Sequence, residues 1–274
     1  MSEPILLFYE PRYSSLIGHF NEKLIIYDFI DNRLGFTEVP RWMKYYIELL
    51  MKKSDVVTTS SKNLYENALS NGAKKVFLVR NAVDIDHFQN QKHNIPFDIK
   101  LLQKPIIGYV GALYEWFDFE LIEKIALKFV ASSILLIGPV HPEQLSNISA
   151  LKKYENIHVI GARSYNDLPN YISQFDVAII PFKVNDLTNY VNPVKLYEYL
   201  ASDKTVVSTS LPDIFEYEDI VYIAQDHDTF IRAIEKALNN NKKRNYVDFL
   251  INNTWDKRAE TMIDIIIKYS KGDP

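Results

Sequence analysis

The sequence predicts an α/β protein built on two parallel β-sheets, each with helices on both faces. Short apolar runs alternate with segments of helical period along all 274 residues. Within the runs successive positions are apolar, as in strands that are buried on both faces. The stretch 89–104 divides this pattern, because it is polar, contains Pro96 and has no clear period. We therefore expect one domain before it and one after it.

The first half predicts four strands with helices between them. Trp42, Tyr46 and Leu49 recur at helical spacing, so a helix is expected at 41–53. A second helix is expected at 61–71, closed by Gly72 at the position of a C-terminal cap. The strands are expected at 5–8, 24–27, 55–59 and 76–79.

The second half is more regular. Asp118 precedes a segment with one apolar face and is a suitable N-cap for it. Strands are expected at 105–110, 134–138, 157–160, 177–181, 205–208 and 220–223. Helices are expected at 118–130, 142–153, 166–174, 193–201, 228–239 and 246–269. The predicted domains are residues 1–90, residues 105–245, and a C-terminal helix within 246–274 that packs back towards the N-terminal domain.

Composition excludes several classes of protein. The formal charge is 31 − 35 = −4, which disfavours a protein that coats nucleic acid. The chain has no cysteine, so disulfides and thiolate chemistry are excluded. No apolar run approaches the ~18 residues of a membrane-spanning helix, and the N-terminus lacks the features of a signal peptide. We expect a cytoplasmic protein.

The histidines give no sign of a metal site. Six of them are scattered along the chain without the spacing of metal ligands. No Asp-x-Asp follows a predicted strand as a metal-held nucleotide site would need. We therefore expect metal-independent chemistry and no cofactor.

The segment after the predicted strand 177–181 could bind an anion. Pro193 suits the first turn of a helix and Asn192 suits its N-cap, so free N–H groups would face the carboxyl ends of the strands, where ligands bind in parallel sheets. Lys195 and Glu198 are three residues apart and project to the same side. A nucleoside diphosphate needs such a cation for its phosphates and such a carboxylate for its ribose hydroxyls. The alternative is an exposed Lys–Glu pair on an amphipathic helix.

Two further loops follow predicted strands. Gly111 would let the backbone approach a ligand closely, although a tight turn explains it equally well. Arg163 follows Gly161, and its guanidinium matches phosphate oxygens in charge and geometry. The alternative is a surface arginine paired with a nearby carboxylate.

Five short motifs follow one another between residues 54 and 223. They are Ser54-Asp-Val-Val-Thr-Thr-Ser-Ser, Arg80-Asn-Ala-Val-Asp-Ile-Asp-His-Phe, Gly108-Tyr-Val-Gly-Ala, Phe175-Asp-Val-Ala-Ile-Ile-Pro-Phe and Asn192-Pro-Val-Lys-Leu-Tyr-Glu-Tyr-Leu-Ala. Taken in order, these motifs resemble those of retaining nucleotide-sugar glycosyltransferases of family 4, or group 1, and most of all the enzymes of cell-surface polysaccharide and teichuronic-acid-type synthesis. This resemblance implies a GT-B-like architecture, with two Rossmann-like domains facing a cleft.

The resemblance implies a role for each matching residue. Glu198 matches the second glutamate of the family's Glu-x7-Glu element, which contacts the ribose, and Lys195 would face the diphosphate. Gly111 matches the glycine beside the phosphates, and the stretch from Gly161 to Tyr165 lies where the base is held. The turn that contains Asn81 and Asp84 is expected to be structural.

The chain departs from the family pattern at the donor site. Tyr190 stands in place of the first glutamate, so Asp186 or Thr188 is expected to contact the donor sugar. Tyr114, Glu115 and Trp116 stand where many relatives have an arginine and a lysine. We expect Lys195 and Arg163 to supply the catalytic positive charge instead.

The predicted N-terminal domain is shorter than that of relatives and is expected to be incomplete. A compact variant, a split enzyme completed by a partner chain and a truncated product all remain open. Ile30 and Asp31 fall where relatives have a His-Asp pair, so Asp28 and Asp31 are candidates to bind or deprotonate an acceptor hydroxyl. The alternative is that they only form the turn after the strand.

The expected function is transfer of a sugar, with retention, from a UDP- or GDP-linked donor to a glycan or lipid-linked acceptor. A nucleotide-sugar epimerase and a non-catalytic or partner-dependent nucleotide-sugar-binding subunit are the alternatives. Peripheral contact with the inner face of the membrane is also open, through an aromatic and basic helix, although such aromatics more often lie in a core. Its residues are Trp42, Lys44, Tyr45, Tyr46, Lys52 and Lys53.

Overall fold

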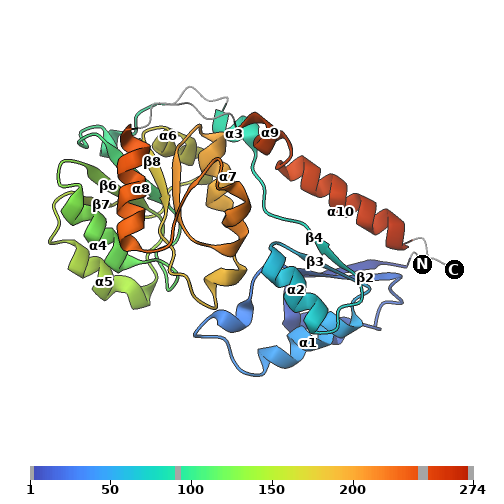
Figure 1. The fold of residues 1–274 in the computed structure, drawn as a ribbon. Helices are drawn as coiled ribbons and strands as arrows, with labels where there is room; N and C mark the ends of the chain where they lie inside the picture. Colours follow the sequence, from blue (N-terminus) through green and yellow to red (C-terminus); the bar gives the residue numbers. More distant parts are fainter. Residues whose placement is uncertain (1–2, 90–93, 240–245, 271–274) are drawn as a thin grey trace. The chain divides into compact units, whose positions relative to one another are not determined.

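The computed structural model describes residues 3–89, 94–239 and 246–270. These residues form two compact units, each with its own sheet (Figure 1). Unit 1 contains the described residues of Met1–Ala82, Asn185–Asn192 and Trp255–Pro274. Unit 2 contains those of Val83–Val184 and Pro193–Thr254.

Unit 1 is built on a four-stranded parallel sheet. Its strands are β1 (Ile5–Phe8), β2 (Leu24–Phe29), β3 (Val56–Thr59) and β4 (Val76–Leu78), and they lie in the order β1-β2-β3-β4. Because all four strands run parallel, their carboxyl ends lie at one edge of the sheet, and the residues that follow β2 lie at that edge.

Helices cover both faces of this sheet. On one face α1 (Met43–Lys53) and α2 (Lys62–Ser70) share a core with Tyr27 and Phe29 of β2. On the other face α10 (Trp255–Ser270) places Ile265 against Leu24 and Val56. The shorter turns of helix are η1 (Pro11–Leu16), η2 (Arg33–Gly35) and η6 (Thr188–Tyr190).

Unit 2 is built on a six-stranded parallel sheet in the order β10-β9-β8-β5-β6-β7. Every residue of β5, β6, β8 and β9 is buried, which explains why their sequences are apolar except for Ser133 in β6 and for Ser208 and Thr209 in β9. The strands are β5 (Ile106–Val110), β6 (Ser133–Ile137), β7 (Ile157–Val159), β8 (Val177–Ile180), β9 (Val206–Thr209) and β10 (Tyr222–Ala224).

Helices cover both faces of this sheet as well. On one face α4 and α8 pack against each other, and on the other α7 packs against β8, β9 and α3. The helices are α3 (Ile85–Gln89), α4 (Phe119–Lys128), α5 (Leu145–Leu151), α6 (Leu168–Ile172), α7 (Val194–Ala201), α8 (His227–Asn239) and α9 (Val247–Ile251). The turns of 3-10 helix are η3 (Phe97–Ile99), η4 (Pro142–Gln144), η5 (Tyr165–Asp167) and η7 (Pro212–Tyr217).

Side-chain caps begin two helices at the residues where the sequence predicts that a helix starts. Asp118 accepts a hydrogen bond from the N–H of Leu121 at 3.0 Å and begins α4. Ser61 accepts one from the N–H of Leu64 at 3.2 Å and begins α2. Gly72 follows the end of α2 with φ +90°, a left-handed conformation that favours glycine.

The structure differs from the sequence prediction near both ends of unit 2. The single helix expected at 246–269 is two helices, α9 and α10, because Asn253 and Thr254 leave the helix to pair with Val83. The same pairing places Val83 and α3 in unit 2, so the chain enters this unit at residue 83 and not near residue 90.

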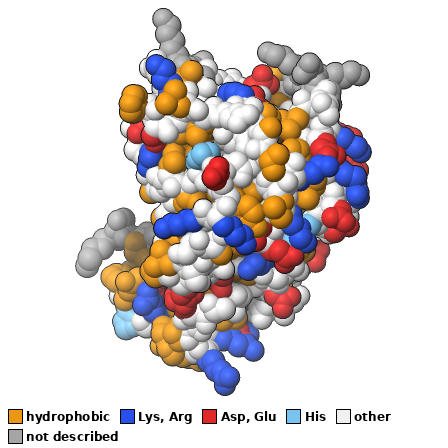
Figure 2. All heavy atoms as spheres, turned by 90° about the vertical axis from the view of Figure 1, so that its left-hand side faces the viewer, with side chains coloured by type: hydrophobic (Ala, Val, Ile, Leu, Met, Phe, Trp, Pro, Cys, Tyr) orange, Lys and Arg blue, Asp and Glu red, His pale blue; other side chains and the backbone are white. Residues whose placement is uncertain are grey.

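The surface is mixed in character. On the face shown in Figure 2, basic side chains are interspersed with acidic and hydrophobic ones. Within the described ranges, none of the helices combines the length and the apolar character needed to cross a membrane.

Candidate functional site

The strand order of unit 2 defines where a ligand would bind. The strands β5 and β8 are neighbours, and the order runs from β5 to β6 and β7 on one side and from β8 to β9 and β10 on the other. A sheet of this kind opens a crevice outside the carboxyl ends of the two strands at which the order reverses. The loops that follow β5 and β8 are therefore the first place to look for a site.

Three glycines bring the loops after β5, β6 and β7 close together. The N–H of Gly138 donates to the carbonyl oxygen of Gly161 at 3.0 Å. A Cβ atom on Gly138 would lie 1.9 Å from the carbonyl oxygen of Gly111, and one on Gly111 would lie 2.3 Å from the hydroxyl of Tyr109. Gly161 has φ +72°, which favours glycine. The backbone itself thus forms this edge of the site.

Lys195 and Glu198 lie in α7, the helix that follows β8. Their Nζ and Oε2 atoms form an ion pair at 2.9 Å, with 21% of the lysine side chain and 7% of the glutamate side chain exposed. Lys195 stands in the first turn of α7, where unpaired N–H groups and the helix dipole favour an anion. One turn of helix thus presents a cation with spare donors and a carboxylate with spare acceptor positions.

Tyr165 lies close to this carboxylate. Burial, together with the charges of Glu198 and Asp84, raises the pKa of Tyr165 to about 12. The ring of His87 stacks on the ring of Tyr165 with centroids 4.3 Å apart and 9° between the planes. His87 Nε2 is 3.0 Å from the carbonyl oxygen of Tyr165, and since a carbonyl can only accept, that nitrogen carries the proton. The segment 84–87 therefore orients Tyr165.

The sequence analysis gives no role to two of these residues. His87 stands in the motif that begins at Arg80 but is otherwise one of six scattered histidines, and Gly138 is expected only as the end of a strand. The signal that could have found them is their position, because one follows the Asp84 turn and the other follows a strand that neighbours β5.

The beginning of α7 differs from the prediction. Asn192 is not the N-cap, which is Pro193 with φ −74° and ψ 116°. The side-chain carbonyl of Asn192 instead accepts a hydrogen bond from the N–H of Asn81 at 3.0 Å, and its backbone carbonyl accepts one from the Asn81 side chain at 2.6 Å. These bonds occupy the group that would have capped the helix, and they hold the Asn81 turn in unit 1.

The guanidinium of Arg163, expected to supply positive charge to the diphosphate, is bound to other groups of the protein. It donates to Asp98 at 2.6 Å, to the hydroxyl of Tyr171 at 2.9 Å and to the carbonyl oxygen of Ile160 at 2.6 Å. This geometry is the alternative stated above, a surface arginine paired with a carboxylate. We therefore do not include Arg163 in the catalytic set proposed below.

Asp186 and Thr188 belong to unit 1. Asp186 is exposed. Thr188 is fully buried, and its hydroxyl oxygen accepts a hydrogen bond from the N–H of Asn185 at 3.0 Å, which closes the turn. Tyr190, which stands in place of the family's first glutamate, packs against the α1–α2 core.

Asp28 and Asp31 lie at the carboxyl end of β2 in unit 1. The carboxylate of Asp28 accepts a hydrogen bond from the hydroxyl of Thr58 at 2.6 Å. Burial raises the pKa of Asp28, although this hydrogen bond lowers it in part. Asp31 is exposed just beyond the strand. Among the residues that the structure describes, no three His, Asp or Glu side chains gather in a way that could hold a metal ion.

Two parallel-sheet units with this site define a GT-B-like α/β protein. Sucrose-phosphate synthase from Thermosynechococcus elongatus is similar in structure, with a TM-score of 0.75 and 15% identity over 97% of this chain and 73% of that one. Anabaena Alr3699/HepE, solved with UDP and glucose, has a TM-score of 0.73 and 12% identity over 96% of this chain and 77% of that one.

The sequence identifies the family. The model of the family described as "Glycosyl transferases group 1" matches residues 104–240, which are 137 of the 274 positions. The chain belongs to this family. It is 29% identical over 234 residues to the "Putative teichuronic acid biosynthesis glycosyltransferase TuaH" of Bacillus subtilis (strain 168). The match covers 81% of this chain, and the chain spans 58% of the length of that relative.

Proposed function

We propose that this protein transfers a sugar from a nucleoside diphosphate sugar to a hydroxyl group of a glycan or lipid-linked acceptor. The observation that carries the proposal is the pair formed by Lys195 and Glu198 in the first turns of α7, beyond the carboxyl end of β8. Membership of the group 1 family supports the same activity.

Each half of the pair has a role in binding the donor. Lys195 Nζ carries three donors and gives one to Glu198, so the others can bind the diphosphate. Glu198 has two oxygens, which suit the two hydroxyls of a ribose. Tyr165 and Gly161 lie beyond β7, where the base would be held. In this proposal the nucleotide extends across the carboxyl edge from β7 to α7.

Departure of the diphosphate is the difficult step of the transfer. Negative charge builds on the leaving phosphate, and fixed cations and N–H groups lower the barrier because they need no reorganisation. Lys195 and the N-terminus of α7 would supply them, with the backbone of Gly111 beside the phosphates. The proposed transfer is metal-independent and retains the configuration of the sugar, with the leaving phosphate accepting the proton of the acceptor hydroxyl.

The carboxyl end of β2 is our proposed place for the acceptor. Asp28 is held by Thr58 and Asp31 is exposed beyond the strand, so a hydroxyl could bind either carboxylate. UDP is the first donor nucleotide to test, because HepE was solved with UDP and glucose, and GDP is the second.

A lipid-linked acceptor would bring the protein to a membrane surface, and α1 is our proposed contact. Trp42 is 49% exposed and Tyr45 65% exposed, while Met43 and Ile47 of the same helix are buried. Exposed aromatic rings and lysines are typical of helices that lie at a lipid interface. We expect Trp42→Ala and Tyr45→Ala each to reduce the fraction of protein that sediments with anionic vesicles. If the variants sediment as much as the unmodified protein does, this role is contradicted.

The experiment that tests the function measures release of UDP or GDP from sugar nucleotides, with and without extracted cell-surface glycan. Lys195→Ala should reduce release by about 100-fold or more, as the loss of a transition-state charge contact typically does. Lys128→Ala is the matched control, because Lys128 also pairs with a glutamate at 2.9 Å but on the surface of unit 2. Equal rates for the two variants would refute the assigned role.

A non-catalytic nucleotide-sugar-binding subunit is the second candidate. The pairing of Arg163 with Asp98 favours it, because it engages a cation expected at the donor, and so does Tyr190, because it replaces the family's first glutamate and packs against a core. Binding of a nucleotide without turnover under any condition of the assay above would establish this candidate in place of the transferase.

A further inference from the structure

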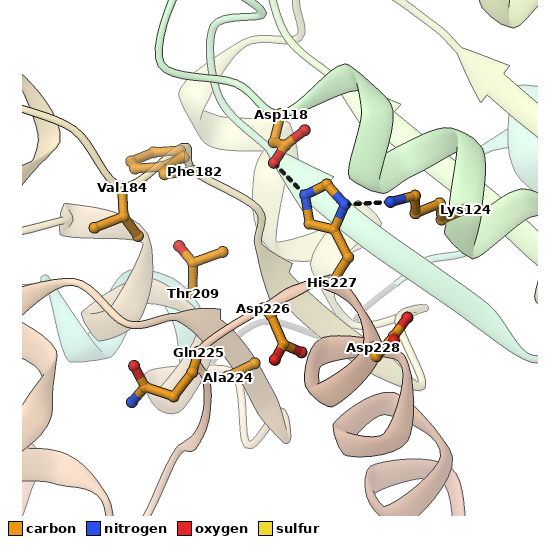
Figure 3. Close-up of a pocket in the computed structure, with 10 residues that line it drawn as sticks. All are labelled: Asp118, Lys124, Phe182, Val184, Thr209, Ala224, Gln225, Asp226, His227 and Asp228. Carbon is orange, nitrogen blue, oxygen red and sulfur yellow. Dashed lines mark hydrogen bonds and ion pairs between the residues drawn. The ribbon is translucent and has the colours of Figure 1, made fainter.

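A pocket lies in unit 2 apart from Lys195 and Glu198. It has a volume of about 520 Å³ and opens where β8, β9 and β10 end, on the side of the sheet that carries α4 and α8. Figure 3 shows Phe182 and Val184 on one side of it, Asp118 and His227 on the other, and Thr209 between them. Its lining includes neither Lys195 nor Glu198. The proposed nucleotide site does not explain this pocket.

One wall of the pocket is fixed by a chain of hydrogen bonds. His227 Nε2 is 2.8 Å from Asp118 Oδ2, and His227 Nδ1 is 3.0 Å from Lys124 Nζ (Figure 3). The lysine can only donate, so Nδ1 accepts and Nε2–H donates to the carboxylate. This chain joins the first turn of α8 to the N-cap and first turns of α4, and it makes the wall rigid.

The charges of the pocket favour neither a free cation nor an anion. Asp118 already caps α4, and Asp226 accepts hydrogen bonds from the N–H and the hydroxyl of Thr229 at the start of α8. Lys124 is shared between Glu120 at 2.9 Å and His227. Asp118, Asp226 and Lys124 are thus engaged within the protein, while these two carboxylates and that of Asp228, which also lines the pocket, together disfavour a phosphate.

The polar groups that remain suit hydroxyls. Gln225 lines the pocket, and within the described residues its amide has no hydrogen-bond partner. The hydroxyl of Thr209 donates weakly to the carbonyl of Ile180 at 3.5 Å, which leaves its oxygen able to accept. An amide and a hydroxyl in the same pocket as Phe182 and Val184 combine polar groups with an apolar surface, as a sugar ring requires.

We propose that this pocket binds a neutral saccharide unit of the glycan acceptor or product. The proposal rests on the transferase function, and it assigns a glycan contact to unit 2. Gln225 and Thr209 bind hydroxyl groups of the ring, and Phe182 packs against its apolar face. The wall formed by Asp118 and His227 holds these groups in place.

The test measures binding of the methyl glycosides of glucose, galactose and N-acetylglucosamine, which saturation-transfer NMR detects. Gln225→Ala and Thr209→Val should each weaken binding by about 3- to 10-fold, the effect of one lost hydrogen bond. Gln103→Ala is the matched control, since Gln103 is exposed in the same unit and does not line the pocket. The methyl glycoside of glucuronic acid should bind more weakly than that of glucose.

A second arm separates this proposal from the proposed function. Glu198→Gln should weaken binding of UDP by about 30- to 150-fold and leave binding of the glycosides unchanged. Binding of the glycosides that survives Gln225→Ala and is lost in Glu198→Gln would place the sugar at α7 and overturn the proposal. Absence of binding for all the neutral glycosides in the unmodified protein would overturn it as well, whether or not UDP binds.

Discussion

Replacing Glu198 with glutamine removes a negative charge from α7 and keeps the shape of the side chain. The carboxylate is 7% exposed and 2.9 Å from Lys195. If it binds the ribose, each oxygen accepts from one hydroxyl, whereas the glutamine amide has one acceptor oxygen and an NH2 group. Bonds to a charged acceptor are worth ~1.5–3 kcal/mol and neutral ones ~0.5–1.5 kcal/mol. The variant should therefore lose about 2–3 kcal/mol of nucleotide binding, or about 30- to 150-fold in affinity.

Thermal unfolding with and without nucleotide measures this loss. At 100 times the dissociation constant, nucleotide adds about 2.7 kcal/mol to the unmodified protein. The same concentration adds about 0.3–0.9 kcal/mol to the variant. With ~2–4 °C of melting temperature per kcal/mol, the shift falls from about 5–11 °C to about 1–4 °C. Each protein is compared with itself, so a change in the stability of the free variant does not affect the result.

Glu235→Gln is the matched control for this experiment. Glu235 forms a pair with Lys128 at the same distance of 2.9 Å, but its side chain is 38% exposed. An exposed pair is worth about 0–1 kcal/mol, and it should not alter the shift caused by nucleotide. A full shift in the Glu198→Gln protein, or an equal loss in both proteins, would refute the assignment of Glu198 to the ribose.

Three further changes test other parts of the molecule. Gly138→Ala places a Cβ atom 1.9 Å from the carbonyl oxygen of Gly111, so the unfolding free energy in urea should fall by about 1–3 kcal/mol. Burial raises the pKa of Asp28, so its contribution to stability is present below the ordinary pKa and is lost as pH rises through the raised pKa. Asp28→Asn should remove this loss of stability with rising pH, which urea unfolding at a series of pH values from 4 to 7 measures. An unchanged dependence of the unfolding free energy on pH would contradict the prediction. Ile265→Ala should cost about 2–5 kcal/mol, whereas Ile267→Ala, at a position 47% exposed on the same helix, should change stability by less than about 0.5 kcal/mol.

The strands were predictable because their signal is local. A strand buried on both faces favours apolar residues at successive positions, as β8 shows throughout and β6 shows after Ser133. Each run expected from the sequence overlaps a strand of the structure. The helix α3 escaped prediction because it has five residues and buries only Phe88, which is too little for a period to emerge.

In the candidate site as well, contacts between residues close in sequence were predictable and contacts between distant residues were not. Lys195 and Glu198 are three residues apart on one helix, so their pairing follows from helical geometry. The contact of His87 with Tyr165 spans 78 residues, and that of Arg163 with Asp98 spans 65. Nothing in the local sequence separates the histidine that orients a ring from the other histidines. Local patterns therefore indicate which residues can do chemistry, and the tertiary fold decides which of them are engaged elsewhere.

The path of the chain through the two units governs the order in which they can be completed during synthesis. Unit 1 needs three separate stretches, of which α10 is made only after all the residues of unit 2. Until then Leu24, Ile26 and Val56 of its sheet lack the helix that covers them. All the described residues of unit 2 have been synthesised once Thr254 has been made. The sheet of unit 1 is thus made before unit 2 but completed after it, and an expressed fragment ending near residue 90 would expose an apolar sheet face and invite aggregation.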